Sequence, residues 1–233
     1  MHTNVYKPAV RLFLTALCVA VGANWGLSQA TGVVSPVDTF AVIVPARTID
    51  EIKADLDATD GVRARAKTRL ENAKEQVRKT ESDIATKKKE IDVLESRMDA
   101  ADKEKKDTVV AAFKVQISGV ENLRDLLKRR LDTRSAEVDA AEGVVDYTDV
   151  AGSLFEKEMS LAKKRQERAS VTASGGLPAA LANLDKEIRE QELSVLDAQV
   201  DRLKKQEKSL SLERDLVKQQ MKLAEAQAKL LEK

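Results

Sequence analysis

The chain has 233 residues, of which 34% are charged and only 3% are aromatic, and its 40 basic residues nearly balance 39 acidic ones. Globular domains carry about 25% charged residues, so this excess with so few aromatic residues favours long charge-rich helices or disorder. The near-neutral net charge of +1 argues against nucleic acid as a partner, because binding to phosphates requires a clearly basic surface.

The first part of the chain, residues 1–30, has the features of a secretory signal peptide. Lys7 and Arg11 precede an apolar run over 12–23, and small residues occupy the cleavage position that ends at residue 30. The run is shorter than the roughly 20 apolar residues of a membrane-spanning helix. We predict cleavage after residue 30 and no integral membrane span afterwards; cleavage after residue 23 and an uncleaved anchor are the alternatives.

Loss of the signal peptide would also remove the chain's single cysteine, Cys18, and its single histidine, His2. Cys18 follows Leu17 inside the apolar run, whereas a lipidated cysteine follows a small residue at the end of such a run. The remaining chain would have no disulfide, none of the usual zinc sites built on Cys and His, and no Ser-His or Cys-His pair. We therefore expect no enzymatic activity, no metal site and no cofactor.

Residues 31–47 form an apolar, β-branched stretch between Pro36 and Pro45, which predicts one extended, strand-like segment. A single strand cannot form a sheet alone. We expect the segment to pack along the helices; pairing with a copy of itself, or no fixed structure, are the alternatives.

A capping-box pattern follows this segment, with Thr48 three residues before Glu51. It predicts a short helix over 48–60, which Asp60 and Gly61 can interrupt. No proline then occurs until Pro178, so the intervening sequence is compatible with helix throughout.

A regular seven-residue repeat predicts a coiled-coil helix in the first half of residues 61–170. Its members are Leu70, Val77, Ile84, Ile91 and Met98. The positions three residues later are mixed in character, so a narrow apolar seam with one or two partner helices is expected.

Residues 102–108 are wholly polar, and the apolar pattern resumes in a new phase after them, including Ile117, Leu131 and Val138. We interpret 61–170 as an antiparallel coiled-coil hairpin with its tip at 102–108. A phase shift within one continuous helix is the alternative. We interpret the basic runs as solvated helix faces. The alternative is contact with an anionic surface at the tip, which carries Lys103, Lys105 and Lys106.

A glycine- and proline-containing linker over 171–178 precedes a third coiled-coil helix, predicted over 179–233. Its seven-residue repeat consists of Leu196, Leu203, Leu210, Val217, Ala224 and Leu231, and we expect Leu203 and Leu210 to lie on a buried stripe. Leu184 and Ile188 lie one residue out of this phase, which predicts a skip in the repeat near Val195.

The predicted fold is therefore all-α and elongated: a coiled-coil hairpin, a third long helix and a short N-terminal extended segment. Narrow seams are only marginally stable alone, so a homo-oligomer is expected. Together with the export signal, these features favour a structural or interaction protein of the bacterial cell envelope, periplasmic or secreted, that serves as a spacer, adaptor or scaffold through coiled-coil contacts with protein partners.

In outline, the extended segment Val37–Val44 followed by the long hairpin over 62–170 resembles periplasmic chaperones of the Skp type. Those chaperones pair an N-terminal strand with long helical tentacles. The resemblance implies a holdase that binds unfolded outer-membrane proteins, and we retain this as the alternative function. The chain departs from that family in its neutral charge and in its C-terminal helix.

Overall fold

A computed structural model describes residues 43–231, so the predicted signal peptide and most of the predicted extended segment lie outside the described residues. The chain divides into two units, residues 1–39 and residues 40–233. The described part of the second unit is all-α: helix covers 93% of it, and it contains no strand.

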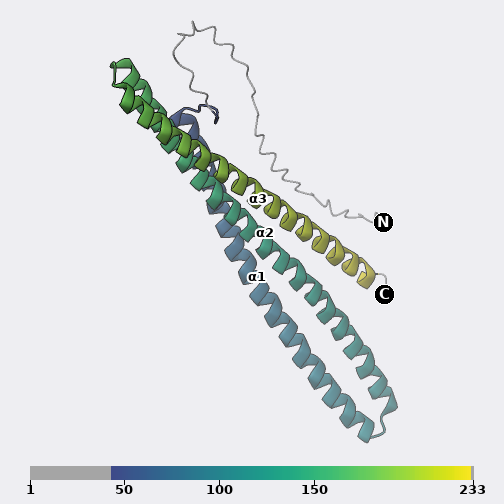
Figure 1. Cartoon of the computed structure of the whole chain (residues 1–233). Coiled ribbons are helices and arrows are strands. Elements are labelled where there is room, and N and C mark those ends of the chain that lie inside the picture. Colours follow the sequence, from purple (N-terminus) through teal and green to yellow (C-terminus); the bar gives the residue numbers. More distant parts are fainter. Residues whose placement is uncertain (1–42, 232–233) are drawn as a thin grey trace, which may run out of the picture. The chain divides into compact units, whose positions relative to one another are not determined.

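Three long helices make up this unit: α1 (Ile49–Lys103), α2 (Asp107–Ala173) and α3 (Pro178–Leu231). At 1.5 Å per residue they are about 80, 100 and 80 Å long. Short turns at 104–106 and 174–177 connect them (Figure 1). Lengths of this kind greatly exceed the diameter of a small globular domain, so each helix can bury only a narrow face against its neighbours.

The central helix α2 packs against both of the others, whereas α1 and α3 make no close backbone contact with each other in the described part of the chain. Ion pairs give the direction of the α1–α2 pairing, since Arg63 contacts Asp149 and Lys74 contacts Glu142. Residue numbers rise along α1 as they fall along α2, so these two helices form an antiparallel hairpin.

The α2–α3 pairing is also antiparallel, but it starts from the opposite end of α2. Arg168 near the end of α2 contacts Asp185 near the start of α3, and Asp146 farther back contacts Lys205. The two pairings are consequently staggered, and α1 alone accompanies about the first four turns of α2.

The predicted capping box at the start of α1 is confirmed. The Glu51 amide donates to the Thr48 hydroxyl at 3.3 Å, and the Thr48 amide donates to the Glu51 carboxylate at 2.9 Å. The hydrogen bond from the Thr48 backbone holds the pKa of Glu51 below its usual value. Two of the N–H groups that a helix start leaves unpaired are thereby satisfied.

The short helix predicted over 48–60 does not exist as a separate element, because α1 continues through Asp60 and Gly61 without interruption. One glycine inside a helix costs only about 1 kcal/mol relative to alanine. Ile52 and Leu56 before the glycine belong to the cluster around Phe155 of α2, and Ala66 after it is buried, so packing on both sides offsets that cost.

The first turn is shorter than the predicted tip at 102–108, since α1 extends to Lys103 and α2 begins at Asp107. Within the turn, Lys105 has φ of 55°, a left-handed conformation that ends the helix. The chain therefore reverses here, in contrast to the alternative of one continuous helix with a phase shift. The predicted linker at 171–178 likewise shortens to four residues, because α2 extends to Ala173.

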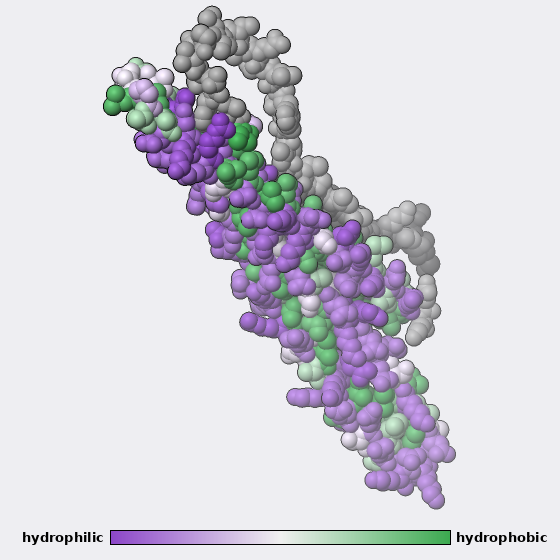
Figure 2. All heavy atoms as spheres, in the orientation of Figure 1, coloured by the Kyte–Doolittle hydropathy of each residue, from purple (hydrophilic) through white to green (hydrophobic). Residues whose placement is uncertain are grey.

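Two clusters of buried apolar residues lie where the N-terminal part of the unit meets α2 and α3. One contains Ile52 of α1 with Ala151 and Phe155 of α2. The second joins the residues before α1 to both other helices and consists of Val44, Leu154, Leu161, Ile188, Val195 and Ala198. Figure 2 shows the apolar side chains in narrow bands along the helices, flanked by hydrophilic surface.

Two glycines give opposite expectations for substitution by alanine. Gly119 lies within α2, and a Cβ added there would meet no atom within 4 Å. Gly119→Ala should therefore raise the free energy of unfolding by about 0.5–1 kcal/mol, measured by denaturant titration. Gly175 has φ of +72°, where a side chain is strained, so Gly175→Ala should lower it. Equal shifts for the two variants would contradict this assignment.

Candidate helix-interaction surfaces

The apolar repeat predicted in the first helix faces α2. Its five residues are Leu70, Val77, Ile84, Ile91 and Met98. Ile91 is buried and the other four are half-buried. The predicted α2 residues Ile117, Leu131 and Val138 are also half-buried. The α1–α2 surface is therefore built from side chains at the predicted positions, with the small residues Ala73 and Ala101 completely covered between them.

A second face of α2, which the sequence did not reveal, packs against α3. It uses small or polar residues: the Thr133 hydroxyl lies 3.3 Å from the Gln219 carbonyl, and Gly143 lies against Ser209 and Leu212. A Cβ on Gly143 would come within 2.8 Å of Leu212 Cδ1. Small residues here allow the two backbones to approach closely, but they carry no hydropathy signal in a sequence.

The helix α3 has two apolar stripes along its length. The inner stripe faces α2, is buried, and consists of Leu184, Ile188, Val195, Ala198, Ser209 and Leu216. The outer stripe is exposed and consists of Leu193, Val200, Leu203, Leu210, Val217, Met221 and Leu231. The predicted residues Leu203, Leu210, Val217 and Leu231 all belong to the outer stripe, and Leu196 is half-buried beside the larger core cluster. The prediction that Leu203 and Leu210 are buried is therefore wrong for the single chain, because α2 packs on the other stripe.

No skip occurs in α3 near Val195. The phase that starts with Leu184 and Ile188 continues to Leu216 as the inner stripe, and the strong leucine repeat is a separate face of the same helix. The outer stripe is displaced from the inner stripe by one to two residues, so the centres of the two stripes lie about 150° apart around the helix axis.

A buried charged network fixes residues 43–47, here called the N-terminal arm, to α2 and α3. The side chain of Glu192 is completely buried, with 0% exposed, and its Oε1 accepts from Arg165 Nη2 at 2.6 Å. The same carboxylate oxygen lies 3.3 Å from the Ile43 amide, and Arg165 Nη2 also donates to the Val44 carbonyl at 2.6 Å. Charged groups out of water require such partners, so this network sets one position for the arm.

A second ion pair lies at the end of the arm. Arg47 donates to the nearly buried carboxylate of Glu158 at 2.6 Å and also contacts Asp55. Its guanidinium carbon lies 5.8 Å from the centre of the Phe155 ring, within the range of a cation–π contact. The arm thus connects the start of α1 to both later helices.

The three lysines proposed for tip contact, Lys103, Lys105 and Lys106, are all exposed at the α1–α2 turn. Lys106 pairs with Glu104 at 2.6 Å, so part of the positive charge of the turn is balanced locally. Whether this end binds an anionic surface stays a prediction.

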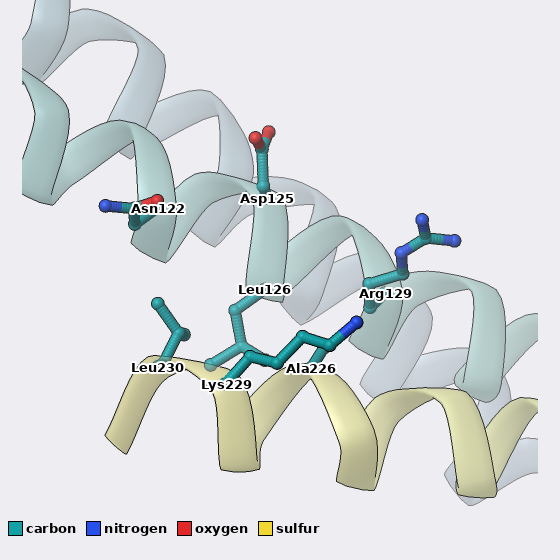
Figure 3. Close-up of a pocket in the computed structure, with 7 residues that line it drawn as sticks. All are labelled: Asn122, Asp125, Leu126, Arg129, Ala226, Lys229 and Leu230. Atoms are coloured by element: carbon teal, nitrogen blue, oxygen red, sulfur yellow. The ribbon is translucent and has the colours of Figure 1, made fainter. Parts of the chain in front are cut away.

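An open groove lies between α2 and the C-terminal turns of α3 (Figure 3). Leu126 of α2 points toward Ala226 and Leu230 of α3, while the carboxylate of Asp125 points away from α3. Lys128 holds the pKa of Asp125 below its usual value. The groove continues the helix–helix surface, with apolar side chains at its base and charged groups on its rim.

Comparison with protein-family models, curated proteins and solved structures finds no match to this chain. Between residues 43 and 231, no helix combines the length and apolar character needed to cross a bilayer. Over the same residues, no three His, Cys, Asp or Glu side chains gather in a way that could hold a metal ion.

Proposed function

We propose that this protein is an exported coiled-coil structural or interaction protein of the bacterial cell envelope, which acts as a spacer, adaptor or scaffold through helix–helix contacts. The observation that carries the proposal is the outer stripe of α3. It places seven large apolar side chains on solvent at heptad positions, and such a face is the usual recognition element of a helix that binds another helix.

Support for the structural role comes from the way the helices are used. Each helix packs only on its neighbour in sequence, and their long faces are laced with ion pairs such as Arg63–Asp149 and Lys205–Asp146. Support for export comes from the basic start, the apolar run and the small-residue site within residues 1–30. Homo-oligomerisation is part of this proposal, since a second chain could cover the exposed apolar face.

Export can be tested through the mass of the mature protein. The periplasmic fraction of a bacterial host should yield a chain that begins near Thr31, measured by intact-mass spectrometry. A mass that includes residues 1–30, or an added diacylglycerol on Cys18, would contradict the predicted processing.

The holdase alternative makes a different prediction. A holdase should suppress aggregation of an unfolded outer-membrane protein at stoichiometric amounts, whereas a spacer or scaffold should leave the aggregation rate unchanged. Light scattering during dilution of such a substrate from urea measures the difference, with bovine serum albumin as the inert control. Suppression by this chain would overturn the scaffold proposal.

A further inference from the structure

The outer stripe of α3 is a nearly continuous heptad pattern. From Leu193 to Leu231 the positions of this pattern follow steps of three and four; Leu196, Ala224 and Ala228 fill the gaps between the seven residues of the outer stripe, and Glu207 and Arg214 occupy the two charged positions. The stripe extends over about 57 Å. Its apolar residues are larger than the alanine and serine of the inner stripe, yet they are the ones exposed to solvent.

We propose that the outer stripe binds the outer stripe of a second copy of this chain, in an antiparallel arrangement with its twofold axis near residue 212. The inference rests on the proposed helix–helix function and adds the partner, the face, the direction and the register. A twofold interface uses the same patch on both copies, so the patch must be complementary to itself when reversed.

The two charged residues within the stripe determine the direction. In a parallel, in-register pair Glu207 would face Glu207 and Arg214 would face Arg214 of the second copy, which places like charges together. In the antiparallel register Glu207 and Arg214 of opposite copies lie in adjacent layers, about 4.5 Å apart along the axis. Neither side chain forms an ion pair within residues 43–231, so both are available for this contact.

The apolar side chains are matched as well. The register brings Leu193 opposite Leu231 and Leu203 opposite Met221 of the second copy, so both ends of the stripe are covered. It leaves α2 in place, because the inner stripe that binds α2 lies about 150° around α3 from the outer stripe. Each copy can therefore bind its own α2 and the second α3 at once.

Disulfide cross-linking tests direction and register directly. The full chain is used with Cys18→Ser, so that the introduced cysteine is its only thiol. Leu203→Cys and Met221→Cys chains carrying different affinity tags are mixed and oxidised. The antiparallel register predicts a disulfide between the two variants. Leu203→Cys alone should stay uncross-linked, because its two copies would lie about 27 Å apart, far beyond the roughly 4.4–6.8 Å between Cα atoms of a disulfide.

A charge exchange gives a second readout, by sedimentation equilibrium. Glu207→Arg and Arg214→Glu should each weaken dimerisation by about tenfold, because each places like charges in adjacent layers. The double variant should restore the original affinity. Leu210→Lys should also weaken dimerisation, whereas Val115→Lys should not, since Val115 is 74% exposed on α2 and lies outside the stripe.

Three results would overturn the inference. Self-cross-linking of Leu203→Cys would indicate a parallel pair, and a dimer that is insensitive to Leu210→Lys would indicate another surface. A monomer across the accessible concentration range would exclude a second copy as the occupant of the stripe. None of these results affects the predicted export or the scaffold-versus-holdase assay, so failure of this inference is distinguishable from failure of the proposed function.

Discussion

Replacement of Glu192 by alanine should lower the free energy of unfolding by about 3–5 kcal/mol, the range found when one partner of a buried ion pair is removed. Arg165, which is only 18% exposed, would lose its carboxylate, and the Ile43 amide would lose its acceptor. The remaining charge would then lie out of water without a counter-charge. Urea denaturation followed by circular dichroism measures the change.

Two variants separate this effect from a general weakening of α3. Glu190 lies two residues away on the exposed side of the same helix, with its Oε1 3.9 Å from Lys186, and Glu190→Ala should change stability by less than about 1 kcal/mol. Glu192→Gln keeps the volume and one acceptor, so its cost should be smaller than that of Glu192→Ala. A loss for Glu190→Ala as large as for Glu192→Ala would contradict the buried network.

The second large effect is expected at Ile188, whose side chain is completely buried among Val44, Leu154, Leu161 and Val195. Ile188→Ala should cost about 2–5 kcal/mol, from lost burial and from the cavity left in the larger core cluster. The effect should also loosen the N-terminal arm, because Val44 belongs to the same cluster. The midpoint of thermal unfolding at fixed concentration reports the loss.

Val115→Ala is the matched control, since this β-branched apolar residue is exposed and its truncation should change stability by no more than about 0.5 kcal/mol. Leu203→Ala is informative in a different way. In a single chain it should behave as Val115→Ala does, and it should become costly only at concentrations where the outer stripe is covered. If Ile188→Ala and Val115→Ala shift the midpoint equally, Ile188 is not in the core.

The approximate positions of the three helices could be predicted from the sequence, because heptad repeats and capping residues are local patterns. The heptad of large apolar residues from Leu70 to Met98 and the Thr48 capping box each reflect contacts within one helix or one face. The interruption predicted at Gly61 was wrong, because it was judged from the local sequence alone. Packing between helices outweighs a single unfavourable residue, and packing is not visible in a local pattern.

The face of α3 that binds α2 was hidden for another reason. Large leucines such as Leu203 and Leu210 dominate a hydropathy pattern, whereas close helix approach uses residues such as Gly143, Ala198 and Ser209. A repeat of large residues therefore indicates that a face binds a helix without indicating which helix it binds. Two apolar repeats that are out of phase with each other in one helix indicate two partners. Leu184 and Ile188 belong to the repeat that faces α2.

The buried ionic network was missed because charge on these helices is so common. Glu192 and Arg165 are two among 79 charged residues, and nothing in their spacing distinguishes them from the solvated faces around them. Their burial depends on the path of the N-terminal arm across α2 and α3, a contact between residues more than a hundred positions apart. Only the three-dimensional arrangement brings them together.

The staggered pairing of α1 and α3 along α2 has a consequence for how the chain folds. Every helix contact joins neighbours in sequence, and each hairpin can grow outward from a turn of three or four residues, where the entropic cost of loop closure is smallest. The two turns lie at opposite ends of α2, so the growing hairpins approach each other along a shared helix. The N-terminal arm can make all of its contacts only after the α2–α3 hairpin has formed, because it needs Arg165 and Glu192 together. Its hydrogen bonds to these two side chains therefore depend on the pairing of α2 with α3.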